Sequence, residues 1–366
     1  LQRHISAAIA YNIWLYYHFT HDRDFLLNYG LEMFIEICRF WASATKQDGK
    51  KFSISGVMGP DEFHEKYPDS DKGGLKNNAY TNIMAAWCLQ KVRFLLEELS
   101  GDEREKVSRK TGLKKKEWER WDKISNNLQV NISKSGIIEQ FEGYFKLKEL
   151  KLDKYRKKYD DIHRMDRILK AEGKSPDDYK MAKQADTLML YFNLGDRGAD
   201  EILRNMGYVS KPGMLIKNFD YYMKRTSHGS TLSRVVHSLL ARMAGYNQVS
   251  FDLFMEALES DYVDIQGGTT GEGIHAGVMG GTVVLAMTLI AGISWMDETL
   301  NVDPYLPGQW EMVSFKLCFK ENSYIFTVYK NELQVYFSSP EKKNGNIFIR
   351  GSLKTLINNQ QNRFIL

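Results

Sequence analysis

Apolar side chains recur at helical spacing through about the first 295 residues, and long helices dominate the prediction for this part of the chain. In the segment 80–99 apolar residues fall almost all round the helix, which predicts a helix buried on several sides. Asn78 precedes this segment and Asp22 precedes another, and both residue types are favoured helix N-caps. The predicted helices cover 6–17, 24–43, 80–99, 114–125, 175–194, 199–206, 230–244, 250–258 and 274–293.

The segment 101–166 is more charged than its surroundings and less regular. It contains a short amphipathic helix at 114–125, followed by an irregular stretch through Gly136 and Gly143. We interpret it as an excursion on one face of a helical domain. Long helices joined by long Gly-rich loops favour a barrel of helix pairs over a simple bundle, although periodicity alone leaves both open.

The pattern changes after Asp303-Pro304. Three segments, 312–319, 324–329 and 333–337, alternate apolar and polar residues with period two, and Lys330-Asn331 predicts a tight hairpin turn. The sequence therefore predicts a helical domain at 1–302 followed by a small antiparallel β-sheet domain at 303–366.

Composition excludes several classes of protein. A chain of 366 residues with 43% hydrophobic residues can bury a large core, and a net charge of +4 does not imply a nucleic-acid partner. The three cysteines are far apart and suit a reducing cytoplasm better than a disulfide framework. The most apolar stretch, 277–295, is rich in Gly and Ala and follows a polar loop, so we expect a buried helix and no membrane span.

The start of the chain suggests a fragment of a longer protein. Leu1 is not a start methionine, and the sequence is already in helical register there. We expect further barrel helices before Leu1 to cover the apolar stripe of Ile5, Ile9, Ile13 and Tyr16. Without them, a contiguous exposed apolar patch would favour aggregation or partner binding.

Acidic residues in one loop are the first candidates for chemistry. Gly59-Pro60 forces a turn that projects Asp61 and Glu62 from a rigid loop. A carboxyl group held in this way can serve as a general acid. Taken alone, an acidic loop residue is more often part of a turn or a cap.

Two further kinds of polar segment lie between helices. Lys183-Gln184 precede an apolar helical stretch, where such a pair can grip sugar hydroxyls, although alone it would be ordinary surface polarity. The loops 225–233 and 266–275 each offer hydroxyls, a histidine and free backbone N–H groups at a helix N-terminus, which is a recipe for binding an anion. Neither loop has the Gly-Lys-Ser/Thr spacing of a P-loop.

Other kinds of catalytic site are not indicated. The eight histidines include no His-x-x-x-His pair, and the cysteines lack metal-ligand spacing, so no metal site is expected. A Ser-His-Asp hydrolase would need a Gly-x-Ser-x-Gly elbow, which is absent.

Five of these segments, taken in order, resemble glycoside hydrolase family 65, which contains maltose, trehalose, kojibiose and related disaccharide phosphorylases. The resemblance implies an (α/α)6 barrel, incomplete here at its N-terminus, followed by a small C-terminal β-sheet domain. Met223 follows Tyr221-Tyr222 where several members carry Glu, so the acceptor sugar is not assigned. The matching blocks are 59–65 with 77–82, 183–186, 226–233, 267–275 and 279–282.

The resemblance also implies roles for individual residues. Glu62 matches the general acid, with Glu65 ranked well below it, and Lys183 and Gln184 match sugar-contacting positions. The phosphate site is expected from two segments, with His228, Ser230, Thr231, Thr269, Thr270 and His275. No cofactor is expected beyond inorganic phosphate as co-substrate, and relatives suggest a homodimer.

The implied reaction is inverting phosphorolysis of an α-glucosidic disaccharide to β-glucose 1-phosphate. An inverting hydrolase needs a second carboxylate to activate water, whereas phosphate is largely dianionic near neutral pH. An acid-trehalase-like hydrolase remains an alternative, with Asp261, Asp264 or Glu272 as its base. An inactive fragment that serves as an interaction module is another. The sequence does not identify the disaccharide linkage.

Overall fold

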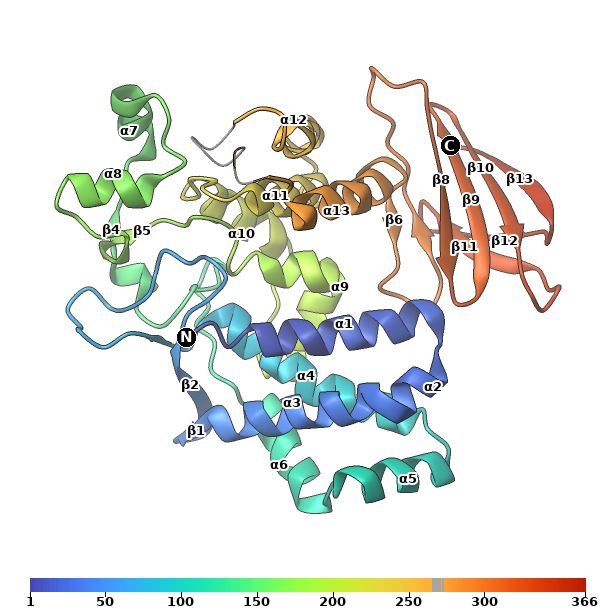
Figure 1. The fold of residues 1–366 in the computed structure, drawn as a ribbon, viewed down its shortest axis with the longest axis horizontal. Coiled ribbons are helices and arrows are strands. Elements are labelled where there is room, and N and C mark those ends of the chain that lie inside the picture. Colours follow the sequence, from blue (N-terminus) through green and yellow to red (C-terminus); the bar gives the residue numbers. More distant parts are fainter. Residues whose placement is uncertain (265–270, 272) are drawn as a thin grey trace. The chain divides into compact units, whose positions relative to one another are not determined.

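A computed structural model describes residues 1–264, 271 and 273–366 of the chain. They form two compact units (Figure 1). The first unit combines Leu1–Trp14 with Arg23–Ser233, and the second combines Leu15–Asp22 with Arg234–Leu366. Helix α1 (Ile5–Thr20) therefore contributes its beginning to the first unit and its end to the second.

The core of the first unit is built around α4 (Ala79–Glu97). Every residue from Ala79 to Leu89 is buried, because α3, α6 and α9 pack against this helix. Asn78 caps it, and its side-chain oxygen accepts the Thr81 N–H at 2.9 Å, which confirms the predicted cap. Further helices of the unit are α2 (Arg23–Phe25), η1 (Leu26–Gly30), α3 (Leu31–Ala44), α5 (Gly101–Thr111), α6 (Lys115–Ser125), η2 (Tyr144–Lys146), α7 (Leu152–Tyr159), α8 (Met165–Ala171), η3 (Pro176–Asp178), α9 (Met189–Asn205) and α10 (Met214–Met223).

One helix prediction for this unit was wrong in part. Residues 175–188 form no α-helix: they contain the 3-10 turn η3, the short strand β5 (Tyr179–Lys180) and an extended segment whose Ala182 pairs with Thr226. This segment runs past buried polar groups that supply its hydrogen bonds, which a sequence pattern does not reveal. The helices α7 and α8 form after Gly143, where the sequence predicted no element (Figure 1).

Several short strands precede the segments of the candidate site along the chain. Strands β1 (Thr45–Asp48), β2 (Lys51–Val57) and β3 (Leu75–Lys76) form one antiparallel sheet, while β4 (Lys148–Glu149) pairs in parallel with β5. Strand β2 ends directly before the loop with Gly59-Pro60, so the sheet fixes where that loop begins.

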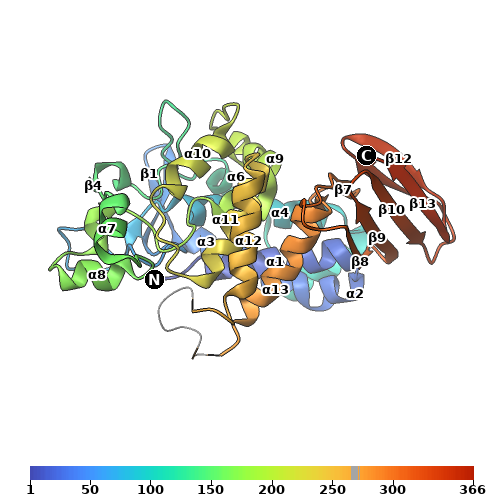
Figure 2. The same cartoon turned by 90° about the horizontal axis from the view of Figure 1, so that it is seen from above.

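The second unit contains most of α11 (Thr231–Met243), which starts in the first unit, together with α12 and α13. Helices α12 (Asn247–Glu259) and α13 (Ala276–Leu285) pack side by side (Figure 2), and α13 continues into the π-helical turn η5 (Ala286–Ile290). These elements match the helices predicted at 230–244, 250–258 and 274–293.

Two four-stranded sheets complete the second unit (Figure 1). The first has the order β13-β10-β9-β8 and is antiparallel, and the hairpin predicted at Lys330-Asn331 joins β9 to β10. Its alternating residues, such as Phe326 and Val335, are buried, as period-two patterning requires. The strands of this sheet are β8 (Met312–Phe319), β9 (Asn322–Tyr329), β10 (Glu332–Ser338) and β13 (Gln360–Ile365).

The second sheet has the order β12-β11-β7-β6, and its β7 and β11 are parallel. Strands β6 and β7 precede residue 303, whereas β11 and β12 follow it, so this sheet takes strands from both sides of the predicted domain boundary. The boundary between 302 and 303 stays a prediction. The strands are β6 (Ile293–Ser294), β7 (Asn301–Val302), β11 (Gly345–Ile349) and β12 (Ser352–Leu356).

The apolar stripe predicted on α1 is only partly exposed. Ile5, Ile9 and Tyr16 are exposed, whereas Ile13 is buried, so Ile13 does not belong to the stripe. Within the part of the chain that the structure describes, no helix combines the length and the hydropathy that crossing a bilayer requires.

Candidate active site

The loop that follows β2 is packed too tightly for any residue larger than glycine at its start. A Cβ atom at position 59 would lie 2.0 Å from Asp186 Oδ2 and 2.5 Å from Asn78 Nδ2. The next residue is held from the other direction, because Gln184 Nε2 donates a hydrogen bond to the Pro60 carbonyl at 2.6 Å. The Gly-Pro turn is therefore rigid, as the sequence predicts.

Asp61, the next residue of the loop, is buried rather than presented to substrate. Only 2% of it is exposed. Its Oδ1 accepts the Lys183 N–H at 2.7 Å, and its Oδ2 accepts Gln140 Nε2 at 3.1 Å and faces His64 Nδ1 at 2.6 Å. Because both oxygens of Asp61 have hydrogen-bond partners, this carboxylate anchors the loop and has no free oxygen for catalysis.

His64 is the cation that balances this buried carboxylate. Its Nε2 lies 2.9 Å from the Tyr179 carbonyl, which can only accept, so Nε2 carries a proton. Its Nδ1 faces Asp61. Burial lowers the pKa of His64, but the Asp61 carboxylate more than offsets this effect, and the net result is a raised pKa. Both ring nitrogens thus face oxygen acceptors, an arrangement that favours the imidazolium form of His64.

A second buried carboxyl group, Asp186, lies on the other side of the loop. Its Oδ1 accepts Asn78 Nδ2 at 2.9 Å, and its Oδ2 accepts the Asp61 N–H at 3.3 Å. Burial, with the nearby Asp61 charge as a second cause, raises the pKa of Asp186 to about 7. Below that pH the group is a neutral acid, which limits charge repulsion beneath the loop.

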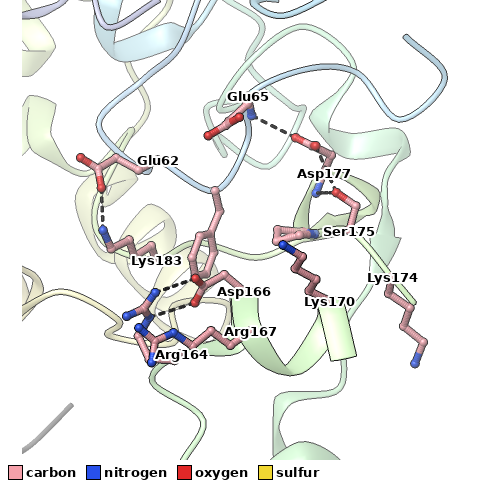
Figure 3. A pocket seen from close by; sticks show the side chains of 12 residues that line it. Glu62, Glu65, Arg164, Asp166, Arg167, Lys170, Lys174, Ser175, Asp177 and Lys183 are labelled. Atoms are coloured by element: carbon pink, nitrogen blue, oxygen red, sulfur yellow. Dashed lines mark hydrogen bonds and ion pairs between the residues drawn. The ribbon is translucent and has the colours of Figure 1, made fainter. Parts of the chain in front are cut away.

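Glu62 follows Asp61 in the loop, and its side chain lies outside the buried network. Its backbone has φ of 65°, a left-handed conformation that costs a non-glycine residue about 1–3 kcal/mol and is concentrated at functional sites. The half-buried side chain reaches Lys183 Nζ through Oε2 at 2.6 Å, and Gln2 Nε2 donates to Oε1 at 3.3 Å. The strain turns Glu62 away from its buried neighbours and toward Lys183 (Figure 3).

Glu62 and Lys183 line a pocket of about 560 Å³, within the usual range for small-molecule sites (Figure 3). Both residues come from segments identified in the sequence. The rest of the lining comes from the residues after Glu62 and from the segment 164–177, whose last three residues belong to a predicted helix. These residues are Phe63, Glu65, Arg164, Asp166, Arg167, Lys170, Lys174, Ser175, Pro176 and Asp177.

The segment 226–233 lies beside Lys183. The Gly229 N–H donates to the Lys183 carbonyl at 2.9 Å, and a Cβ at Gly229 would come within 2.4 Å of the His163 carbonyl. His228 has a left-handed backbone, with φ of 55°, and its Nδ1 lies 3.0 Å from Ser233 Oγ. The residues predicted to bind sugar and part of those predicted to bind phosphate are therefore neighbours in one unit.

The rest of the predicted phosphate site is less completely described. Ser230 and Thr231 lie at the start of α11, as expected. Thr269 and Thr270 fall outside the described residues. His275, in the second unit, precedes α13 and is engaged by Asp261, whose Oδ2 accepts the His275 N–H at 3.0 Å and whose Oδ1 lies 2.7 Å from Nδ1.

Sequence reasoning missed the residues that hold the loop. It assigned no role to Gln140, Asp186 or His64, although Asp186 and His64 stand inside the segments it selected. A polar residue next to an apolar run, as Asp186 is, signals a buried hydrogen-bond partner. For a metal ion there is no candidate, because no cluster of three or more His, Cys, Asp or Glu side chains occurs among the described residues.

Comparison with known proteins defines the class. Residues 1–284 match the central catalytic domain of glycosyl hydrolase family 65, and residues 293–356 match the C-terminal domain of the same family. The chain belongs to glycoside hydrolase family 65. The predicted fold class, an (α/α)6 type of mainly α protein followed by antiparallel-rich sheets, is confirmed.

Individual relatives share most of this chain. It is 42% identical over 320 residues, 87% of its length, to a trehalose 6-phosphate phosphorylase from Lactococcus lactis. It is 32% identical over 363 residues, 97% of its length, to a kojibiose phosphorylase from Thermoanaerobacter brockii. A solved structure, a putative kojibiose phosphorylase from human microbiome, superposes with a TM-score of 0.82 at 26% identity, covering 99% of this chain and 49% of that one. The chain spans 40% and 43% of the length of these two curated relatives.

Proposed function

We propose that this chain carries the general acid and part of the sugar and phosphate sites of an inverting disaccharide phosphorylase. The observation that supports this most is the placement of Glu62. A buried network fixes the loop below it, a strained backbone turns it outward, and Lys183 stands beside it at the edge of a pocket. Such a fixed carboxyl group is what proton donation to a leaving oxygen requires.

In the proposed reaction Glu62 exchanges its contact with Lys183 for the glycosidic oxygen. The bond from the anomeric carbon to that oxygen breaks, and the oxygen takes the Glu62 proton. A phosphate oxygen attacks the same carbon from the opposite face, which forms β-glucose 1-phosphate. Hydrogen phosphate releases its own proton to water, and Glu62 is reprotonated from water, so charge and protons balance. Lys183, once released, is free to bind a sugar hydroxyl.

We further propose that phosphate binds at the loop 226–233 and the start of α11, through His228, Ser230 and Thr231. Hydroxyls and free N–H groups at a helix N-terminus favour an anion. The family resemblance also assigns Thr269, Thr270 and His275 to phosphate, and for these three residues it is the support of the proposal. Gln184 is proposed to contact the sugar as well; in the structure its Nε2 donates to the Pro60 carbonyl.

The names of the relatives supply the substrate class. They include phosphorylases of trehalose 6-phosphate, kojibiose, trehalose and 1,2-α-glucosylglycerol. All four substrates contain an α-linked glucose, and they differ in the acceptor. We propose that this protein likewise transfers an α-linked glucose to phosphate, and that no cofactor takes part.

The deciding experiment separates phosphorolysis from hydrolysis. The gene product that contains residues 1–366 is incubated with trehalose, trehalose 6-phosphate, kojibiose, maltose and nigerose, with and without inorganic phosphate. A phosphorylase releases glucose 1-phosphate only when phosphate is present. Release of free glucose in phosphate-free buffer would identify a hydrolase instead. In that case Asp261 would be a poor base, because hydrogen bonding to His275 lowers the pKa of its carboxyl group.

The phosphate site has its own test. Ser230→Ala should raise the KM for phosphate about tenfold or more, because losing one donor to a charged acceptor costs about 1.5–3 kcal/mol. The KM for the disaccharide should not change. An unchanged phosphate KM would place the phosphate elsewhere.

A further inference from the structure

The helices α7 and α8 form a small lobe that is fastened to the candidate catalytic loop. Met165 and Leu169, four residues apart on α8, are fully buried in a cluster that includes Phe63, the residue after Glu62. Residues at this spacing share a helix face. The apolar face of α8 is thus turned toward the loop, and the packing fixes α8 relative to Glu62.

The polar face of α8 supplies cations to the same pocket. Arg167 and Lys170, three residues apart, line the pocket and are both exposed (Figure 3). Within the described ranges, neither side chain has a hydrogen-bond or ion-pair partner. Two exposed cations at this spacing, fixed by a packed helix, are placed for an anion from solution.

The other charged groups of the pocket are mostly committed to protein partners. Glu62 pairs with Lys183 at 2.6 Å. Arg164 pairs with Asp166 at 2.8 Å, and Lys174 with Glu172 at 2.6 Å.

Two carboxylates that line the pocket, Asp177 and Glu65, form no ion pair with a described residue. Asp177 is buried, and its Oδ1 accepts the backbone N–H groups of Glu65 and Lys66 at 2.9 and 3.3 Å. Glu65 itself is exposed and remains a single negative charge against Arg167 and Lys170. Counted with the buried Asp177, the groups without an ion-pair partner balance, but on the exposed side of the pocket Arg167 and Lys170 face Glu65 alone.

We propose that Arg167 and Lys170 bind the phosphate monoester of a phosphorylated acceptor sugar. The inference rests on the proposed function, because it takes Glu62 as the acid that protonates the oxygen of the leaving sugar. That sugar then occupies the pocket that Glu62 and the two cations share. A phosphate monoester carries a charge of about −1.5 to −2 at neutral pH and accepts hydrogen bonds from both guanidinium and ammonium groups. The preferred acceptor is a hexose phosphate rather than a free hexose.

The test compares two ligands that differ only in the phosphate group. Binding of glucose 6-phosphate and of glucose to the gene product that contains residues 1–366 is measured by calorimetry. Glucose 6-phosphate should bind at least about tenfold more tightly, the factor expected for one charge-assisted contact. The double variant Arg167→Ala/Lys170→Ala should lose this preference and keep its affinity for glucose.

A matched control removes two positive charges from the same lobe outside the pocket. Lys154 and Lys157 lie on α7, are exposed and do not line the pocket. The variant Lys154→Ala/Lys157→Ala should keep the preference for glucose 6-phosphate, because the effect depends on position and not on net charge. The conservative variant Arg167→Lys should retain part of it.

Other outcomes would overturn the inference. Equal affinities for the two ligands would contradict it, and so would a preference that survives in the double variant. An inorganic phosphate affinity that falls in the double variant, with the glucose 6-phosphate preference intact, would assign the cations to the co-substrate. Because binding is measured without turnover, a failure of phosphorolysis would not be mistaken for a failure of this site.

Discussion

The two sides of the pocket that contains Glu62 differ in construction. Below Glu62, Asp61, His64 and Asp186 are at most 4% exposed, and hydrogen bonds engage both oxygens of each carboxyl group. Across the pocket, Arg167 and Lys170 are exposed and are held only by the apolar packing of their helix. A group that must deliver a proton needs fixed geometry, whereas a group that recognises an anion can adjust a long side chain.

The difference also concerns charge. On the buried side, the His64 ring lies between the Asp61 carboxylate and the Tyr179 carbonyl oxygen. The same side holds Asp186, whose carboxyl group has a pKa of about 7. Such a network is costly to disrupt, since each removed partner leaves a buried polar group unpaired. Exposed cations carry little of that cost, so their replacement should change recognition without changing stability.

The largest effect on stability is expected from Asp61→Asn. The amide cannot accept hydrogen bonds at both positions, and the buried imidazolium loses its counter-charge, which costs about 3–5 kcal/mol. Urea unfolding measures the loss. The control Asp153→Asn breaks the exposed pair with Arg156 and should cost less than about 1 kcal/mol. Equal effects of the two substitutions would contradict the contrast between buried and exposed charges.

A second prediction uses pH. Because the pKa of Asp186 is raised from its ordinary 3.8 to about 7, the folded chain holds a proton that the unfolded chain has released between these values. Asp186 therefore stabilises the fold below about pH 4, and this contribution is lost as pH rises to about 7. Asp186→Asn should remove a pH dependence on the order of a few kcal/mol. A difference between wild type and variant that is constant from pH 4 to 8 would contradict the assignment.

Gly59→Ala tests the packing at the start of the loop. The added methyl group meets Asp186 and Asn78, so we expect a loss of about 1–3 kcal/mol together with reduced turnover. Gly101→Ala is the control, because its Cβ would have open space and the position begins α5. The control should change the unfolding free energy by less than about 1 kcal/mol. Full activity of Gly59→Ala would show that the loop tolerates displacement.

The smallest effect is expected on the exposed side. Arg167→Ala/Lys170→Ala should change the unfolding free energy by no more than about 0.5 kcal/mol. A loss as large as that of Asp61→Asn would show that these side chains hold the lobe together. The claim that they are available for an anion would then fail.

Sequence reasoning found what local chemistry dictates. The Gly59-Pro60 turn, the Asn78 cap and the alternation of the late strands are short-range signals, and the structure bears them out. It failed where contacts between residues far apart in the sequence determine the local structure. Apolar residues at 175–194 suggested one helix, but pairing of Ala182 with Thr226 keeps part of that segment extended. Helix α8 escaped notice because its seven residues are too few for a periodic pattern.

The central claim is that the buried network presents Glu62, and no other carboxylate, as the proton donor. The direct measurement compares kcat for Glu62→Gln and Glu65→Gln, two substitutions of equal size in one loop, with phosphate and disaccharide at saturation. We predict that Glu62→Gln lowers kcat about 10²–10⁴-fold with unchanged thermal unfolding, while Glu65→Gln stays near wild type. A near-normal kcat for Glu62→Gln beside an inactive Glu65→Gln would contradict the account.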